Sequence, residues 1–140
     1  MISGLWLAAL AAGCATSNRS ASSTPLDPAT LLLAAPSSLE HRAYLGLPQE
    51  TDQFLIQDVA ADLVIVDCFD LYCPSCQKGA KYVNRLYELI EERGLAGRVK
   101  LIGLGLGNTP LEVETFRDKY DIRFPVFPDR SNAIARQFGN

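Results

Sequence analysis

The sequence has few of the residues that bind metals or nucleic acids. Its 140 residues include one histidine and four cysteines, and 13 Lys and Arg stand against 16 Asp and Glu, a net charge of -3. No basic block and no interleaving of basic with aromatic residues occurs, which argues against nucleic-acid binding. The one Cys-x-x-Cys pair has no second pair or matched histidines beside it, so a structural zinc site, which takes four ligands, is also disfavoured.

The N-terminal region has no hydrophobic run long enough to span a membrane. Residues 1–13 are apolar and uncharged, but the run is too short to span a bilayer as a helix, and it is typical of a secretory signal. The sequence Leu-Ala-Ala-Gly-Cys at residues 10–14 resembles a bacterial lipoprotein signal, in which Cys14 would carry the lipid and become the mature N-terminus. No Lys or Arg precedes the run, and Ala11 occupies the place usual for Leu. An ordinary cleaved signal or a buried N-terminal helix is the alternative.

A change of composition follows Cys14. Residues 15–38 are rich in Ser, Thr, Ala and Pro, which is typical of a flexible tether, and a short helix is expected over residues 38–47. We therefore predict a lipoprotein-type signal peptide over residues 1–13, a flexible tether with a short helix over 14–45, and a folded domain over 46–140. A lipid on Cys14 followed by a tether would hold the domain at a membrane on the periplasmic side of a bacterial cell envelope.

The folded region alternates between strand and helix patterns. Buried strands are expected at Leu63–Val66 and Val99–Leu106, and a strand–helix–strand unit of this length implies parallel pairing. The remaining expected elements are a strand and turn at Gln53–Val59, helices at Pro74–Gly94, Thr109–Tyr120 and Asn132–Phe138, and an extended edge at Phe124–Pro128. This order predicts an α/β domain.

The chemistry concentrates between the first buried strand and the helix after it, in Cys73-Pro74-Ser75-Cys76. Pro74 suits a first helical position, because its missing N–H would have no partner there. A cysteine at a helix start faces unpaired N–H groups and the positive end of the helix dipole, and both favour the thiolate. Cys73 is therefore the predicted nucleophile for disulfide exchange, and Cys76, one turn further, is the predicted resolving thiol.

The segment Val66–Cys76 resembles the active-site segment of the thioredoxin superfamily, above all the membrane-tethered, TlpA-like and redoxin-type thiol–disulfide oxidoreductases. The resemblance covers about residues 50–140. It implies that Asp67, six residues before Cys73, matches the buried acid that relays a proton to or from the resolving cysteine. Tyr72 stands where the family usually has Trp, and together with Pro74 it would shield the dithiol from one side.

The resemblance also implies a further segment with a cis-proline, a hairpin and a last helix. The chain ends before it, so we expect an incomplete thioredoxin-like fold with an exposed apolar sheet edge and part of its substrate site missing. Among the other residues of the motif, Asp67 could instead be a strand-end carboxylate in water, and Asp70 reads as a solvated loop residue. Cys68 reads as a small buried hydrophobe, with a resolving or metal role as the alternative.

The function predicted is an extracytoplasmic thiol–disulfide oxidoreductase that exchanges its dithiol with protein disulfides and needs no bound cofactor. Its partners would be protein thiols and disulfides, an upstream electron donor or acceptor, and a membrane through Cys14, with no nucleic acid. A peroxiredoxin-like peroxidase is an alternative, disfavoured because Asp70 stands three residues before Cys73, where that family has Thr or Ser. Another alternative is a Cu(I)-handling module that uses Cys68, Cys73 and Cys76.

Overall fold

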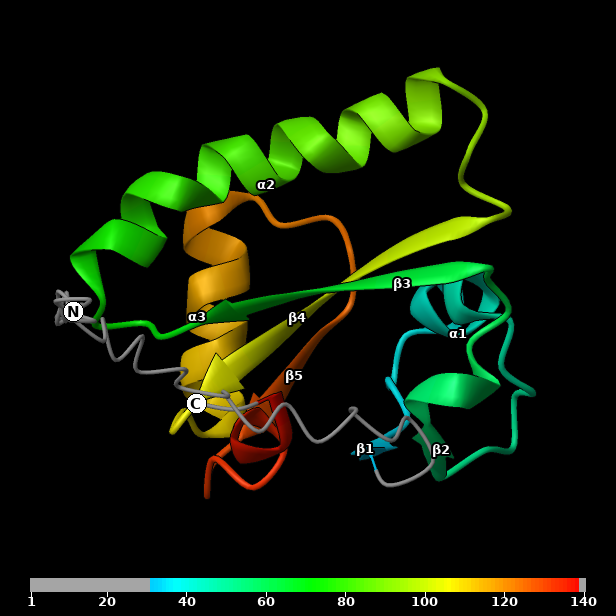
Figure 1. Ribbon diagram of the computed structural model, residues 1–140. Helices are drawn as coiled ribbons and strands as arrows, with labels where there is room; N and C mark the ends of the chain where they lie inside the picture. Colours follow the sequence, from blue (N-terminus) through cyan, green and yellow to red (C-terminus); the bar gives the residue numbers. More distant parts are fainter. Residues whose placement is uncertain (1–30, 139–140) are drawn as a thin grey trace, which may run out of the picture.

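The computed structural model describes residues 31–138, which form two small β-sheets and the helices that cover them (Figure 1). β1 and β2 pair antiparallel, whereas β3, β4 and β5 form a parallel sheet in that order. The strands are β1 (Leu32–Ala34), β2 (Gln53–Leu55), β3 (Leu63–Phe69), β4 (Val99–Leu106) and β5 (Val126–Asp129). The helices are α1 (Leu39–Leu45), α2 (Pro74–Glu92) and α3 (Pro110–Tyr120), with 3₁₀ turns η2 (Ile56–Asp58) and η3 (Ala135–Phe138).

The elements predicted from the sequence are confirmed, apart from the last helix. The predicted helix over 132–138 contracts to the turn η3, because Asn132 adopts a positive φ of 55° and Asp129 supplies an alternative partner. The Asp129 carboxylate accepts the backbone N–H groups of Ile134 and Ala135 at 3.0 and 2.8 Å. A side chain that caps the chain at this point competes with continued helix.

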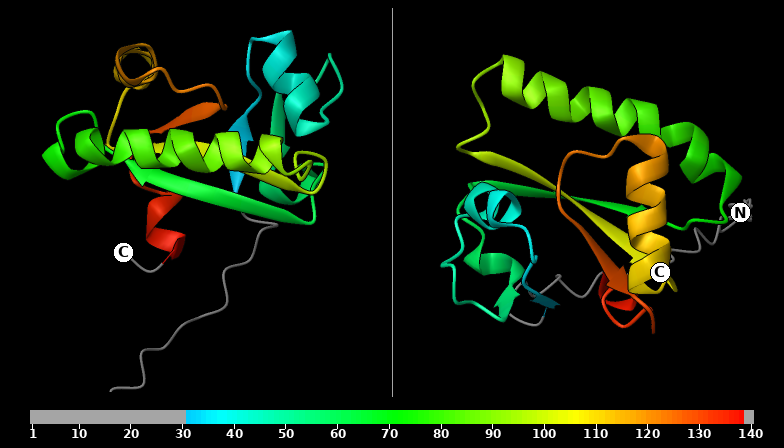
Figure 2. Two further views of the ribbon diagram at one scale, coloured as in Figure 1. Left: turned by 90° about the horizontal axis from the view of Figure 1, so that it is seen from above. Right: turned by 180° about the vertical axis from the view of Figure 1, so that it is seen from behind.

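Two hydrophobic clusters lie on the two faces of the parallel sheet. On one face, α2 and α3 pack over Phe69 and Leu101, and on the other the β1–β2 sheet and α1 pack in one cluster with Ile102 and Leu104 (Figure 2). Alternation along the strands produces this division, since successive side chains point to opposite faces. β4 lies between β3 and β5 and is buried over nearly its whole length, so it is the centre of the fold.

The predicted tether is wrong for residues 31–38, and the predicted start of the domain at residue 46 is also wrong. Leu31 and Leu33 are 1% and 3% exposed and belong to the core cluster that contains Phe127, and β1 pairs with β2. Alternate leucines point inward here, while Leu32 is 49% exposed, so a strand pattern lies within the Ser- and Pro-rich composition. The folded domain therefore includes the described residues from Leu31 to Phe138.

The predicted signal peptide and Cys14 fall outside the described residues. Within residues 31–138, no helix combines the length and the apolar character that a membrane crossing requires.

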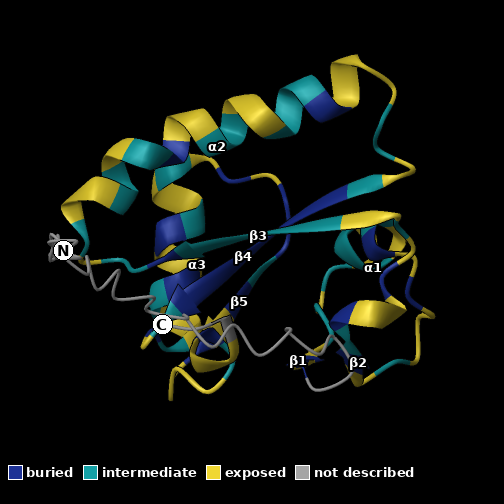
Figure 3. Ribbon diagram, in the orientation of Figure 1, coloured by how far each residue is buried: buried dark blue, intermediate teal, exposed yellow. Residues whose placement is uncertain are grey.

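β3 forms one edge of the parallel sheet among the residues that the structure describes. Leu63 is 53% exposed, and the strand is only partly buried until Phe69 at its end (Figure 3). The exposed apolar sheet edge expected from the sequence is confirmed. The dithiol follows directly from this edge strand.

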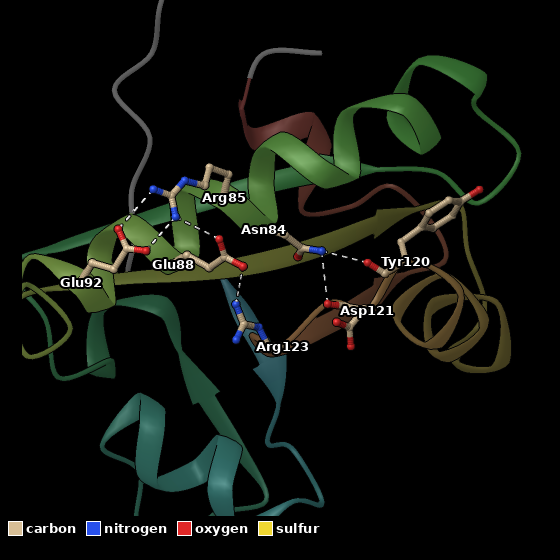
Figure 4. Close-up of polar contacts among 7 residues, drawn as sticks. All are labelled: Asn84, Arg85, Glu88, Glu92, Tyr120, Asp121 and Arg123. Carbon is tan, nitrogen blue, oxygen red and sulfur yellow. Dashed lines mark hydrogen bonds and ion pairs between the residues drawn. The ribbon is translucent and has the colours of Figure 1, made fainter.

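The middle of α2 is fastened to the far end of α3 (Figure 4). Asn84 Nδ2 donates to the carbonyl oxygens of Tyr120 and Asp121, at 2.9 and 3.2 Å. Asp121 ends α3 in the left-handed conformation, with φ of 53°, which Asp tolerates better than most residues. Around this contact, ion pairs of α2 with itself and with the loop after α3 join Arg85, Glu88, Glu92 and Arg123. These contacts join the middle of α2 to the end of α3 and the loop after it.

Candidate active site

Cys73 is the N-cap of α2, and Pro74 is the first residue of the helix, as predicted. The backbone of Cys73 is extended, with φ of -81° and ψ of 112°, so its side chain folds back over the first turn. Its Sγ accepts the backbone N–H of Cys76 at 3.4 Å. The sulfur thus takes the place of the Ser or Asp oxygen that usually caps a helix.

The pKa values of the two thiols move in opposite directions. Hydrogen bonds from the Cys76 thiol, then the Ser75 hydroxyl, then the Cys76 backbone N–H lower the pKa of Cys73 to about 7, and Cys73 Sγ lies 3.0 Å from Ser75 Oγ. Burial, followed by the hydrogen bond that its thiol gives to Cys73, raises the pKa of Cys76. The direction predicted for Cys73 agrees, and the Cys76 and Ser75 side chains are larger causes than the Cys76 backbone N–H.

Asp67 lies on β3, opposite Gly103 of β4, on the same strand face as Phe69. This face packs under α2, in the cluster that Cys76 contacts. Burial raises the pKa of the Asp67 carboxyl, and the Asp67 charge is among the causes that raise the pKa of Cys76. Asp67 is therefore a partly buried acid on the sheet face that α2 covers, rather than a strand-end group in open water.

Cys68 points to the opposite face. It packs against the cluster around Phe127 and Leu104, whereas Cys76 packs against the other cluster. Burial, with the charges of Asp67 and Asp129, raises the pKa of the Cys68 thiol. The three described cysteines do not converge, and within residues 31–138 no group of three or more His, Cys, Asp or Glu side chains could hold a metal ion.

Tyr72 links the loop before the dithiol to α3. Its ring is 68% exposed, and its hydroxyl donates a 2.7 Å hydrogen bond to Glu112 Oε1, in the first turn of α3. Pro74 is exposed beside it. Both residues border Cys73 in the chain, and their shielding of the dithiol stays a prediction.

A comparison with protein-family models shows to which family the chain belongs. Residues 42–140 match the AhpC/TSA family. The chain belongs to this family. The match includes the whole of the candidate site, from Asp67 through Glu112.

Curated relatives of this AhpC/TSA family member include the thiol-disulfide oxidoreductase ResA of Bacillus thuringiensis subsp. konkukian. The two are 30% identical over 84 residues, which cover 60% of this chain and 46% of the relative. ResA of Geobacillus thermodenitrificans is 25% identical over 76 residues, which cover 54% and 41% of the two chains. The chain thus spans about half the length of the curated relatives it matches.

Solved structures establish the fold. A secreted Mycobacterium tuberculosis disulfide oxidoreductase homologous to Escherichia coli DsbE matches with a TM-score of 0.52 at 15% identity, covering 63% of this chain and 61% of that one. A thioredoxin-like protein from Aeropyrum pernix matches with a TM-score of 0.51 at 19% identity, covering 64% and 63%. The AhpC/TSA family member therefore has an α/β, thioredoxin-like fold, over the part that these structures share.

Four site residues were not identified from the sequence: Ser75, Asp70, Asn108 and Glu112. The interpretation of Asp70 as a solvated loop residue is wrong, because its Oδ1 accepts the Tyr72 N–H and Asn108 Nδ2, both at 3.0 Å. Asn108 follows β4, the strand next to β3, and the carboxyl ends of parallel strands meet at one edge. The meeting of strand ends could have pointed to Asn108 from the sequence. For Glu112, the sequence indicates only a role in capping the helix.

A cavity of about 320 Å³ lies elsewhere, between β1, β5 and the first turns of α3. His41, Glu114 and Arg117 contribute its charged or ionisable lining, and no residue of the dithiol loop takes part. The cavity is therefore separate from the candidate active site.

Proposed function

We propose that this AhpC/TSA family member is an extracytoplasmic thiol–disulfide oxidoreductase that exchanges its Cys73/Cys76 dithiol with protein disulfides. The observation that carries the proposal is the asymmetry of the pair. The pKa of the half-exposed Cys73 is lowered to about 7, while that of the more buried Cys76 is raised. A thiol with a pKa near the ambient pH is the best attacking thiol in disulfide exchange. The thiol-disulfide oxidoreductase names of the curated relatives support the same reaction class.

The reaction proceeds in two exchanges. The Cys73 thiolate attacks one sulfur of a substrate disulfide, so that a mixed disulfide forms and the other substrate sulfur leaves as a thiolate. Cys76 then loses its proton and attacks Cys73 Sγ, which forms the Cys73–Cys76 disulfide and releases the second substrate thiolate. Two electrons pass from the dithiol to the substrate, the released thiolates take up protons, and the reverse sequence oxidises a substrate.

Asp67 would accept the proton that Cys76 loses. An acid whose pKa is raised by burial holds and releases protons closer to neutral pH than an exposed carboxyl does. The dithiol itself carries the electrons, so the reaction needs no bound cofactor. Tyr72 and Pro74 would limit the approach of substrates on one side of Cys73.

The experiment is reduction of insulin disulfides by the full chain and its single-cysteine variants. We expect Cys73→Ser to lose all activity above the uncatalysed rate, and Cys76→Ser to accumulate a mixed disulfide with the substrate that mass spectrometry detects. Cys68→Ala is the matched control, and it should retain wild-type activity because Cys68 lies on the other sheet face. Insulin reduction that persists in Cys73→Ser would refute the proposal.

Two further assays on the same variants separate the alternatives. Peroxide consumption that depends on Cys73 and exceeds disulfide exchange would favour a peroxidase. Stoichiometric Cu(I) binding that is lost in Cys68→Ala would favour a copper module. Disulfide exchange with neither of these results is the outcome that we expect.

The location proposed is the periplasmic side of a bacterial membrane, with a lipid on Cys14. The support is the apolar segment over residues 1–13 that ends at Cys14. Labelled palmitate should enter the wild-type protein in a bacterial host and not the Cys14→Ser variant, whose insulin reduction should be unchanged. Equal labelling of the two proteins would overturn the lipid anchor and leave the redox proposal untouched.

A further inference from the structure

Asn108 joins the dithiol loop to the turn between β4 and α3. Its side chain is buried, with 3% exposed, although it is polar. Asn108 Oδ1 accepts the backbone N–H of Leu71 at 3.0 Å, and its Nδ2 donates to Asp70 Oδ1, also at 3.0 Å. The two residues that it holds belong to the loop that leads from β3 to Cys73. A buried amide is stable at such a place because both of its ends are paired.

The same loop is held at three further points. Asp70 Oδ1 accepts the Tyr72 N–H at 3.0 Å, and the carbonyl oxygen of Asp70 accepts the Cys73 N–H at 3.1 Å. From α2, Gln77 Nε2 donates to the carbonyl oxygen of Leu71 at 2.7 Å. Asn108 connects this hydrogen-bonded loop to the end of β4, as Glu112 connects Tyr72 to the start of α3. The conformation of Cys73 as N-cap depends on where the loop delivers it.

The Asn108 side chain also packs against the backbone of β4 at Gly105. A Cβ on Gly105 would lie 3.2 Å from Asn108 Cβ and 3.3 Å from Asn108 Oδ1, so the side chain rests on the β4 backbone. Asn is the side chain that suits the site, because it combines one acceptor and a donor at its tip. Aspartate would lack the donor and would face the Asp70 carboxylate.

We propose that Asn108 is a positioning residue for the dithiol: by holding Asp70 and Leu71 it sets the place of the Cys73 sulfur at the start of α2. This proposal rests on the proposed function for its catalytic meaning. The effect of Asn108 on the ionisation of the Cys73 thiol can be measured without any substrate disulfide. Failure of the proposed function would therefore leave the role of Asn108 testable.

The first test is Asn108→Ala in the full-length reduced protein, with Asn84→Ala as the matched control. Both changes remove a side-chain amide that spans two elements, but only Asn108 touches the dithiol loop. The rate of iodoacetamide alkylation of Cys73 against pH reports its thiolate. We expect Asn108→Ala to raise the midpoint by about one pH unit and to slow insulin reduction roughly tenfold, with Asn84→Ala unchanged in both. Equal midpoints for wild type and Asn108→Ala would overturn the proposal.

The second test keeps the net charge and reverses the pair, with Asp70→Asn and Asn108→Asp combined. Asn108→Asp alone sets two carboxylates against each other, whereas the combined variant again offers a donor to an acceptor, at the cost of the bond that the same Asp70 oxygen accepts from the Tyr72 N–H. In the Asn108→Asp background, we expect Asp70→Asn to bring the alkylation midpoint and the exchange rate part of the way back to wild type, whereas in wild type the same substitution should move neither toward improvement. Additive effects of the two substitutions would show that the residues act independently, against the proposal. This comparison holds even if Asn108→Ala fails to fold.

Discussion

The hydroxyl of Tyr72 donates a 2.7 Å hydrogen bond to Oε1 of Glu112, across 40 residues of sequence. The other carboxylate oxygen of Glu112 accepts the Thr109 N–H at 2.7 Å and so caps α3. One carboxylate thus joins the residue before the nucleophile to the start of the next helix. The bond, together with the Glu112 charge, raises the pKa of Tyr72, while the hydrogen bonds of Thr109 and Tyr72 lower the pKa of Glu112.

Substitution Glu112→Gln should lower the pKa of Tyr72 toward its usual value near 10. The glutamine can still accept from Thr109, so the cap of α3 persists while the negative charge beside the phenol is gone. Titration of the tyrosine ring signals by NMR measures the change. Glu114→Gln, on the same helix but outside this contact, is the control, and an equal Tyr72 pKa in both variants would contradict the expectation.

The pKa of Cys73 should rise more when the Cys76 thiol is removed than when the Ser75 hydroxyl is removed. Because the Cys76 thiol is its largest stabiliser, Cys76→Ala should raise the Cys73 pKa from about 7 toward the value of a free cysteine, about 8.5, and Ser75→Ala should raise it less. Alkylation midpoints in a Cys14→Ser background measure both, since the pKa values of Cys68 and Cys76 are raised and these thiols react later. A larger shift in Ser75→Ala than in Cys76→Ala would reverse the assignment.

Because of Asp67, the stability of the protein should fall as the pH rises. Burial raises its folded-state pKa, so the folded state retains a proton that the unfolded chain has released. The stability that this proton provides is complete below the unfolded pKa and is lost as the pH rises through the folded pKa. Asp67→Asn removes the charge, so its melting temperature should equal that of wild type near pH 3 and exceed it at pH 7.

The control for this expectation is Asp62→Asn, because the Asp62 side chain is 64% exposed and paired at the surface with Arg98. It should show no such gain. A melting temperature of Asp67→Asn below that of wild type at pH 7 would mean that the ionised carboxylate is stabilising, which would weaken the relay role proposed for Asp67.

Most of the fold could be predicted from local patterns in the sequence. The strand β4 and the capped helix α3 have the bounds that apolar periodicity and the Thr109–Glu112 box indicate. β1 was missed because three residues among Ser, Ala and Pro give a weak signal, and its burial comes from partners far along the chain such as Phe127. Composition describes a segment by itself, whereas burial depends on what the rest of the fold brings to it.

The residues of the candidate site likewise fall into those that local sequence predicts and those that only the fold brings together. The strand–helix junction predicts Cys73 and Cys76 locally, and the family resemblance of the same segment implies Asp67. Asn108 is 38 residues from Asp70, and its role depends on the parallel register that sets β4 beside β3. The order of strands and helices predicts that topology, but it does not indicate which side chains meet at the ends of the strands. Contacts between loops of neighbouring strands are therefore the ones that needed the structure.

A last prediction concerns Gly105, which lies under the helix that carries Glu112. A Cβ at this position would meet Val113 Cγ2 at 2.6 Å, and Val113 is 1% exposed, so neither the helix nor the strand has room to yield. Gly105→Ala should therefore destabilise the protein by about 1–3 kcal/mol, the usual cost of overpacking a core, and should also press on Asn108. Urea unfolding measures the loss.

Gly79→Ala is the matched control for Gly105→Ala, because a Cβ at Gly79 in α2 meets nothing within 4 Å. The same chemical change should there stabilise the protein by up to about 1 kcal/mol through helix propensity. The two alanines thus differ in the sign of their effect for one reason, the distance to the next layer. If Gly105→Ala were as stable as wild type, α3 would have to pack further from β4 than the structure indicates, and the Asn108 contacts would loosen with it.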